Sequence, residues 1–474
     1  MWPSISCWAG HTMDDAVLIG VIGLFSLFGL LLLRMPVALA MLTVGVVGNY
    51  ALSIAEPYLR FGPYLAQFKS LLWGTVSSYE LSVVPLFILM GCLAGQAGLS
   101  RDLFRGLHAL VGRIRGGVAM AAIGACAGFG AVSGSSLATA STMGRVALPA
   151  LDQLKYAPRL ATGTLAAGGT LGILIPPSVA LVIYAIIVEA SIIEMFQAAI
   201  LPGALAVLFF IATIALVVRL RPGDAPLGER LDPIERRQAI ARLLPVLFLF
   251  LGIIIGLGLG LFTPTPAAAV GAFAVMVYGF GLRWLTGEGL NLTGLKTALL
   301  DSAVTSGMIY FILFGAEVLK TFFAHAGLPQ LLADWAAMSG FEPMAVLILM
   351  LALLILLGCF MDSLSMILVV VPFVWPVLVL LNGGDFVSAQ DAAFGMDSES
   401  LKLWFGILAL VVVELGLITP PVGLNVFIIA QLAPNTPMGD IFRGVLPFFL
   451  AELVRVALLI ALPGLALAIP MILR

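Results

Sequence analysis

The chain has 474 residues, 61% of them hydrophobic and only 10% charged, and its formal net charge at pH 7 is −2. Soluble domains carry about 25% charged residues, so this composition excludes an ordinary soluble domain and indicates a protein that crosses a membrane many times. The nearly balanced charge gives no reason to expect a nucleic-acid partner.

The N-terminal segment 1–16 lacks the basic stretch of a signal peptide. We expect a tail with Met13 as the true start of translation; a short exposed tail from residue 1 is the alternative. Lys and Arg mark cytoplasmic loops, which places two basic clusters in the cytoplasm. The clusters consist of Arg101, Arg105, Arg113 and Arg115, and of Arg219, Arg221, Arg230, Arg236, Arg237 and Arg242.

In the first half of the chain, apolar runs long enough to cross the hydrocarbon core surround three irregular segments. Continuous crossings are predicted over residues 17–33, 36–53, 81–97 and 192–218. The segment 56–78 is predicted to lie along the headgroups as an amphipathic arm. Segment 117–151 has a small, polar centre and basic residues at both ends, which predicts a re-entrant hairpin entered from the cytoplasm. The run 160–188 is predicted to be a crossing helix broken at "GILIPPS".

The second half repeats this order. Continuous crossings are predicted over residues 243–262, 267–282, 297–323 and 441–468. A hairpin is predicted over about 345–381, and a helix broken at "GLITPPVGLN" over 403–430. An odd number of crossings separates the matching elements, so the two repeats are inverted, as in secondary transporters with discontinuous helices.

The sequence therefore predicts an all-α polytopic membrane protein with about ten full crossings, two re-entrant hairpins and two discontinuous helices. Both termini are expected outside the cytoplasm. Scaffold helices are predicted over 17–97 and 192–323, two transport-domain halves over 98–191 and 324–435, and a C-terminal helix over 436–474.

The hairpin centres and the helix breaks are rich in oxygen atoms, which a dehydrated hard cation prefers, Na⁺ above all. The first tip, "SGSS", offers the hydroxyls of Ser133, Ser135 and Ser136. Pro177 of the first break cannot donate a backbone hydrogen bond, which leaves upstream carbonyls free. The alternative is that these small residues only allow close helix packing. Because tip and break both recur in the inverted half, we favour an ion site.

Asp362 is the most informative single residue of the second hairpin. A carboxylate deep in an apolar run costs about 2.5–3.5 kcal/mol on insertion scales and marks a functional candidate, unless it faces water at the outer surface. Thr419 of the second break adds a hydroxyl where the first break has Ile175, so the two ion sites are not expected to be identical. Asn425 is placed to donate either to a substrate carboxylate or to another helix. Arg145 is placed to pair with an anionic substrate or to end its hairpin arm in the cytoplasm.

The remaining ionisable and nucleophilic residues receive no functional role. The four cysteines and three histidines are scattered singly, without the spacing of a metal or redox motif. No nucleophile–base set or Gly-rich phosphate loop is present, which argues against an enzyme and against an organic cofactor. No coupling role is assigned to the intramembrane candidates Glu189, Asp301, Glu317, Lys320 and Glu414.

Five ordered segments resemble the signatures of the large membrane subunit of TRAP (tripartite ATP-independent periplasmic) transporters, the DctM type. They read "FGAVSGSSLATASTMGRVALPAL", "GILIPPSVALVIYA", "GLFTPTPAAAV", "FMDSLSMILVVVPFVWPVL" and "GLITPPVGLNVFIIA". The resemblance extends from about Met13 to the C-terminus. It implies an elevator-type secondary transporter in the bacterial inner membrane that imports an organic acid, usually a carboxylate, with a Na⁺ gradient. It also implies a small four-helix membrane partner (DctQ type) and a periplasmic substrate-binding protein (DctP type).

Carried over residue by residue, the resemblance implies two Na⁺ sites. The first comprises Ser133, Ser135, Gly172, Ile175 and Pro177, and the second comprises Asp362, Gly416, Thr419 and Pro421. Candidate substrate contacts are Ser136, Ser363, Asn425 and Arg145. The family usually has an acidic residue where this chain has Pro266, so the role of that acid is not carried over. We expect the small subunit to be a separate chain, because no four-helix extension precedes Val17.

Two other functions remain to be weighed against this one. The first is a stand-alone Na⁺-coupled dicarboxylate carrier of the same broad architecture, which takes its substrate directly from solution. The second is a channel or membrane scaffold without coupling, which predicts uptake independent of Na⁺ and no effect of Asp362→Ala. The five ordered segments favour the transporter that depends on a binding protein.

Overall fold

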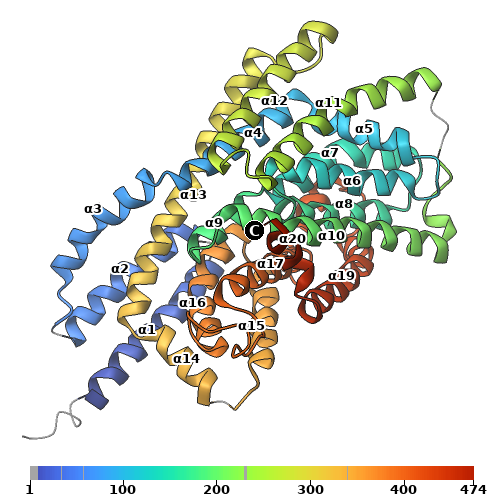
Figure 1. The fold of residues 1–474 in the computed structure, drawn as a ribbon. Helices are drawn as coiled ribbons and strands as arrows, with labels where there is room; N and C mark the ends of the chain where they lie inside the picture. Colours follow the sequence, from blue (N-terminus) through green and yellow to red (C-terminus); the bar gives the residue numbers. More distant parts are fainter. Residues whose placement is uncertain (1–8, 34, 57, 229–231, 339, 474) are drawn as a thin grey trace, which may run out of the picture. The chain divides into compact units, whose positions relative to one another are not determined.

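The computed structural model describes residues 9–33, 35–56, 58–228, 232–338 and 340–473, and within these ranges the regular structure is helical, without β-strands (Figure 1). Nine of the described helices are long and apolar enough to cross a membrane. The number is ten if the bent pair Pro158–Leu174 and Val179–Ile187 counts as one crossing. The predicted all-α polytopic architecture is confirmed.

The contacts divide the chain into two compact units. The first consists of residues 1–81, 304–350 and 368–398, and the second of residues 82–303, 351–367 and 399–474. The tips of both predicted hairpins and both helix breaks belong to the second unit. The division into scaffold and transport parts at the boundaries expected above stays a prediction.

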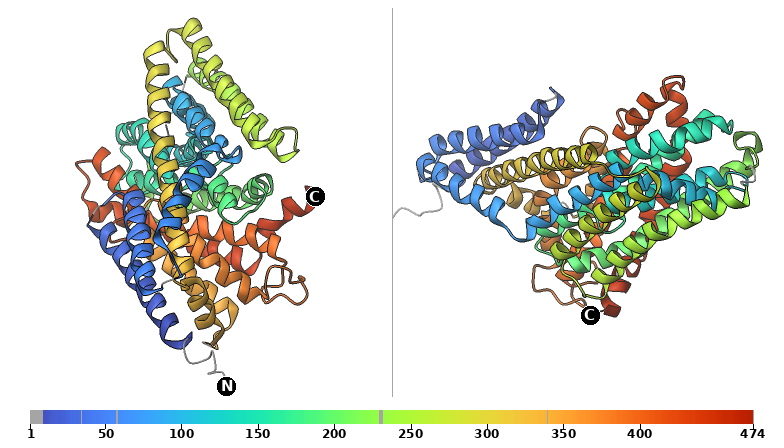
Figure 2. Two further views of the ribbon diagram at one scale, coloured as in Figure 1. Left: turned by 90° about the vertical axis from the view of Figure 1, so that its left-hand side faces the viewer. Right: turned by 90° about the horizontal axis from the view of Figure 1, so that it is seen from above.

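The first unit is built from long apolar helices. Its helices are α1 (Ala9–Leu32), α2 (Val37–Ala55), α3 (Phe61–Ser77), α14 (Leu328–Met338), and the larger parts of α13 (Leu292–His325) and α16 (Ser363–Asn382). Figure 2 shows α1 and α2 side by side. Gly23 of α1 and Gly48 of α2 both face the buried ring of Phe322 on α13, because a glycine leaves room for a large ring. Near that ring, Asn49 and His325 are joined by a hydrogen bond of 2.9 Å.

The second unit contains most of the remaining helices. They are α4 (Val83–Ala97), α5 (Leu99–Val111), α6 (Gly117–Ser133), α7 (Ser136–Gln153), α8 (Pro158–Leu174), α9 (Val179–Ile187), α10 (Ile192–Leu220), α11 (Pro233–Gly258), α12 (Pro264–Thr286), α17 (Ser398–Gly416), α18 (Leu424–Leu432), α19 (Met438–Ala461) and α20 (Gly464–Leu473). Helix α8 lies at the centre, packed against α6, α7 and α19 (Figure 1). Its residues are buried almost throughout, which is consistent with its continuous run of small and apolar side chains. The C-terminal half of α15 (Pro343–Gly358), from residue 351 onward, also belongs to the second unit.

The first hairpin consists of α6 and α7. Gly134 between them has a φ of +59°, a left-handed conformation that glycine adopts without strain. Ser135 then caps the N-terminus of α7, its side-chain oxygen accepting from the backbone N–H of Ala138 at 3.4 Å. The motif "SGSS" is therefore a helix stop followed directly by a helix start, as predicted for the tip.

Both broken helices are interrupted at a Pro-Pro pair. Helices α8 and α9 are bent by 47° at residues 175–178, and α17 and α18 are separated by residues 417–423. The second proline of each pair, Pro177 and Pro421, follows a cis peptide bond. Proline cannot donate to the helical hydrogen-bond ladder, which explains why each helix stops here. The two breaks thus share sequence, position in the repeat and peptide geometry.

The structure differs from the expected elements at three places. The predicted crossing 441–468 is two helices, since α19 ends at Ala461 and Pro463 precedes the new start of α20. The basic segment 99–111 is a helix, α5, rather than a loop. Helix α1 begins at Ala9, inside the expected tail; residues 1–8 of that tail, and Arg230 of the second basic cluster, lie outside the described residues.

Candidate ion and substrate site

The first hairpin tip is seated directly on the first helix break. A Cβ atom added to Gly130 of α6 would lie 2.5 Å from the Cα atom of Gly172 on α8, so the two backbones touch. A Cβ atom on Gly134 would lie 3.0 Å from the backbone nitrogen of Val179, where α9 begins. Side chains at these glycines would hold the tip away from the break. The structure therefore brings tip and break together. The sequence allows this close approach because the residues at the contact are glycines, which have no side chains.

Oxygen atoms converge at this first contact. The Ser133 hydroxyl lies 2.8 Å from the Thr139 hydroxyl and donates to the backbone carbonyl of Ser135 at 3.4 Å. A Cβ atom on Gly172 would lie 2.6 Å from the Thr139 hydroxyl oxygen and 2.8 Å from the Ser135 carbonyl oxygen. Ser133, Ser135 and Gly172 of the predicted first ion site are thus neighbours. Such neutral hydroxyl and carbonyl oxygens are the donors a hard monovalent cation accepts.

Thr139 was missed in the sequence, although its hydroxyl belongs to this cluster. The available signal was its position one helical turn after the tip residue Ser135, on the face that α7 turns to α8. The other two predicted ligands are in the bend. Ile175 is half-buried and its side chain packs beside Gly203 of α10, while Pro177 is buried. For both of them, only the backbone carbonyl is suited to a cation.

The second hairpin tip meets the second break in the same way. A Cβ atom on Gly358, at the end of α15, would lie 3.1 Å from the Cα atom of Gly416 on α17. The Cys359 thiol donates to the backbone carbonyl of Pro420 at 3.4 Å. The Thr419 hydroxyl donates to the carbonyl of Leu415 at 2.5 Å, which leaves its lone pairs available. Pro421 is exposed.

Asp362 caps the N-terminus of α16. Its carboxylate accepts from the backbone N–H of Ser365 at 3.1 Å and also from the hydroxyl of the same serine. The side chain is half-buried. Asp362 therefore directly precedes α16 as Ser135 directly precedes α7. Its role as a helix cap explains why a carboxylate occurs within an apolar run. This explanation lay outside the two considered from the sequence.

Glu414 connects the two hairpins. It is in the last turn of α17 and is 4% exposed. One carboxylate oxygen accepts from the hydroxyl of Ser136 at 2.5 Å and the other from the hydroxyl of Ser363 at 2.7 Å. No role was expected for this acid from the sequence, yet both candidate substrate serines bond to its side chain. Asn425 is fully buried, and its side-chain nitrogen donates to the carbonyl of Ala166 on α8 at 3.4 Å.

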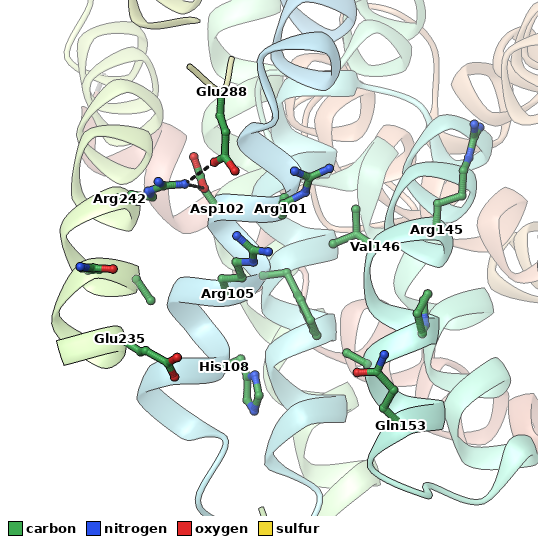
Figure 3. A pocket seen from close by; sticks show the side chains of 15 residues that line it. Arg101, Asp102, Arg105, His108, Arg145, Val146, Gln153, Glu235, Arg242 and Glu288 are labelled. Carbon is green, nitrogen blue, oxygen red and sulfur yellow. Dashed lines mark hydrogen bonds and ion pairs between the residues drawn. The ribbon is translucent and has the colours of Figure 1, made fainter. Parts of the chain in front are cut away.

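Arg145 lies away from the tips. It is exposed, about 13 Å along the axis of α7 from Ser136, and its guanidinium donates to the Ser141 hydroxyl at 2.7 Å. It lines a cavity of about 730 Å³ together with residues of α5 and α11. Figure 3 shows Arg101 and Arg105 on α5 across this cavity from Arg145 on α7. Of the two positions considered from the sequence, the distance from the tip favours the end of the hairpin arm.

One wall of the cavity is held by a charge network. Arg242 of α11 donates to Glu288 at 2.8 Å and approaches the carboxylate of Asp102 at 3.6 Å. Burial raises the pKa of the Asp102 carboxyl, and the guanidinium groups of Arg242 and Arg105 oppose that shift. Arg242 also holds the pKa of the exposed Glu288 carboxyl below its usual value. Arg242 is thus neutralised. Arg101, Arg105 and Arg145 outnumber the remaining acid of the lining, Glu235, and give the cavity its positive field.

The fold and this site together define a class. The chain is a multi-pass membrane protein in which each of two inverted repeats pairs a helical hairpin with a broken helix, which is an architecture of secondary transporters. Residues 24–465 match the family described as "Tripartite ATP-independent periplasmic transporter, DctM component". The chain belongs to this family, as its five signature segments indicated. It is therefore a transporter permease and not an enzyme.

Relatives agree with this assignment, and a solved structure shares the fold. The chain is 32% identical over 426 residues to "C4-dicarboxylate TRAP transporter large permease protein DctM" of Pseudomonas aeruginosa, covering 89% of this chain and 93% of that one. It is 29% identical over 447 residues to "Sialic acid TRAP transporter large permease protein SiaM" of Vibrio cholerae, covering 94% and 97%. The crystal structure of the Alcanivorax borkumensis YdaH transporter matches with a TM-score of 0.59 at 17% identity, over 85% of this chain and 88% of that one. That likeness concerns the fold alone.

Proposed function

We propose that this chain is the large transport subunit of a binding-protein-dependent secondary transporter that imports an organic carboxylate with a Na⁺ gradient. The observation that carries the proposal is the seating of each hairpin tip on a broken helix. Neutral oxygens of Ser133, Ser135 and Thr139 surround the first contact. The hydroxyl of Thr419 and the carbonyl of Pro420 lie at the second. These donors suit Na⁺ as a co-transported ion.

The substrate class follows from charge. The N-termini of α7 and α16 lie at the two tips, and a helix N-terminus carries partial positive charge that favours a carboxylate. The exposed Arg101, Arg105 and Arg145 then give the anion a favourable field in the cavity of Figure 3. The relatives named for C4-dicarboxylate and sialic acid are both named for carboxylic acids. An organic acid is therefore the substrate class that we propose.

Alternating access is proposed to be of the elevator type, with the hairpins and broken helices moving as one transport domain against the scaffold helices. Two partners complete the system: a small four-helix membrane subunit of the DctQ type, and a periplasmic binding protein of the DctP type that delivers the acid. The membership of the family supports both partners. We place the protein in the bacterial inner membrane with both termini on the periplasmic side, on the basis of the basic clusters.

Reconstitution in proteoliposomes tests this proposal. The chain is combined with its cognate small subunit and binding protein, and uptake of radiolabelled succinate and sialic acid is measured with an inward Na⁺ gradient. We expect uptake only with Na⁺ outside and binding protein present. Equal uptake with K⁺ on both sides would refute the coupling. Full uptake without binding protein would instead support the stand-alone dicarboxylate carrier.

A further inference from the structure

Glu414 is a side chain that contacts both hairpins at equivalent places. Ser136 is the first residue of α7 and Ser363 is the first residue of α16, so each is the start of the second helix of its hairpin. Their hydroxyls donate to the two oxygens of the Glu414 carboxylate at 2.5 and 2.7 Å. All three residues are at most 4% exposed. The contact is therefore buried, and it is symmetric with respect to the two repeats.

The physical chemistry makes this contact a strong one. The two serine hydroxyls each bond to a different oxygen of the same buried side chain, so both oxygens are satisfied. A buried carboxylate that lost these donors would be left unsatisfied, which is costly. The carboxylate therefore resists separation from either serine, and a displacement of one hairpin tip is transmitted to the other.

The matching position of the first repeat does not make such a connection. Gly172 matches Gly416, so the position matching Glu414 is Thr170 of α8. The Thr170 hydroxyl donates to the carbonyl of Ala167 in its own helix at 2.6 Å. Its short side chain is used within α8, whereas Glu414 extends beyond α17 to both hairpins. The asymmetry indicates a function that needs one connection between the repeats rather than a packing role repeated in each.

We propose that Glu414 is a positioning residue that ties the first turn of α7 to the first turn of α16 and thereby couples the two ion sites. The inference rests on the proposed function for its ion-binding consequence. When the cation at one tip orders that tip, Glu414 transmits the order to the other, so that the ions bind cooperatively. Removing the tie leaves two sites that bind independently and more weakly.

Three substitutions of Glu414 separate the tie from the charge. In Glu414→Gln, the amide oxygen accepts from one serine and the amide nitrogen donates to the hydroxyl of the other, so both contacts persist. In Glu414→Asp, the side chain is shorter by one methylene and reaches only one hairpin. In Glu414→Ala, both contacts are lost. The matched control is Glu399→Gln, an exposed acid on the same helix that pairs with Lys402 at 2.7 Å.

The first measurement is the Na⁺ dependence of uptake in the reconstituted system. We expect Glu414→Ala and Glu414→Asp to raise the half-saturating Na⁺ concentration at least about fivefold, the lower end of usual coupling energies, and to lower the Hill coefficient. Glu414→Gln and Glu399→Gln are expected to stay within about twofold of wild type on the same scale. An alanine variant that is folded and keeps the wild-type half-saturation and Hill coefficient overturns the proposal. So does a glutamine variant as impaired as the alanine variant, because the charge rather than the tie would then be required.

The second measurement is amide hydrogen exchange, which does not depend on Na⁺ coupling. Ser363→Ala is expected to speed exchange in the first turn of α7, on the other hairpin, and Ser136→Ala in the first turn of α16. The control is Ser365→Ala, which removes a hydroxyl bonded to Asp362 in the same turn of α16 but not to Glu414. It is expected to affect α16 only. Unchanged exchange at α7 in Ser363→Ala refutes the tie, whereas wild-type uptake without Na⁺ dependence refutes the proposed function and leaves the exchange test intact.

Discussion

Gly172→Ala probes the contact between the first hairpin tip and the first helix break. The new methyl group would lie 2.8 Å from the carbonyl oxygen of Ser135 and 2.6 Å from the hydroxyl of Thr139. The hydroxyl can rotate away, but the carbonyl belongs to the backbone of the tip. Non-bonded contacts of this kind are comfortable at about 3.5 Å, so the tip must retreat by roughly 0.7 Å. A site for a small ion tolerates displacements of only about 0.5 Å.

Two opposing energies act in this variant. Alanine in place of glycine favours the helix by about 1 kcal/mol, while overpacking a tight contact costs about 1–3 kcal/mol. We therefore expect the melting temperature to fall slightly or to stay unchanged. If the overpacking strain is released by moving the tip out of the proposed ion-binding position, 1–3 kcal/mol corresponds to a half-saturating Na⁺ concentration raised by about 5–150-fold.

The assay compares Na⁺-dependent uptake and thermal unfolding in detergent for Gly172→Ala and for Gly252→Ala. Gly252 is in α11, where a methyl group would meet no atom within 4 Å. The control variant should gain thermal stability and keep its Na⁺ dependence, because only the helix propensity changes. A folded Gly172→Ala protein with the half-saturating Na⁺ concentration of wild type would refute the assignment of this contact to an ion site.

Three further predictions concern charged residues. Asp362→Ala should lower the melting temperature by removing a cap worth about 1 kcal/mol, whereas Asp362→Ser should restore stability. If the serine variant also keeps the Na⁺ dependence of uptake, Asp362 is a cap and not an ion ligand. Arg242→Gln removes the partner of Asp102 and should destabilise the protein by about 1–3 kcal/mol at neutral pH. Burial raises the pKa of Asp102 in the folded protein, so its charged form destabilises the fold above that pKa. The loss of stability in Arg242→Gln, measured from unfolding curves, should therefore shrink as the pH falls through this pKa. Arg145→Gln should slow uptake of an organic anion at low ionic strength, and the difference from wild type should disappear in high salt if the effect is electrostatic.

The repeated elements were predictable because each leaves a local mark on the sequence. A Pro-Pro pair inside an apolar run ends a helix wherever it occurs, and "SGSS" combines a left-handed glycine with a capping serine. The order of tip and break in each half then predicted which segments meet. These features needed no knowledge of distances, since local backbone chemistry determines them.

The connections across the fold were not predictable in this way. Glu414 and Ser136 are 278 residues apart, and nothing near either residue indicates the other. For Asp362 the sequence showed an acid in an apolar run, but a helix cap and an ion ligand use the same carboxylate, so composition could not separate them. Thr139 was missed for a related reason, because a hydroxyl in a helix of small residues is as common in packing as in binding.

The contacts between Gly130 and Gly172, and between Gly358 and Gly416, bring main chain against main chain without an intervening side chain. A surface made of backbone cannot be altered one atom at a time, because the smallest available substitution is already a methyl group. Redesign of the proposed ion sites is therefore confined to the hydroxyl positions around these contacts. The glycines themselves act as fixed spacers, and a library of variants that randomised them would sample mostly displaced hairpins.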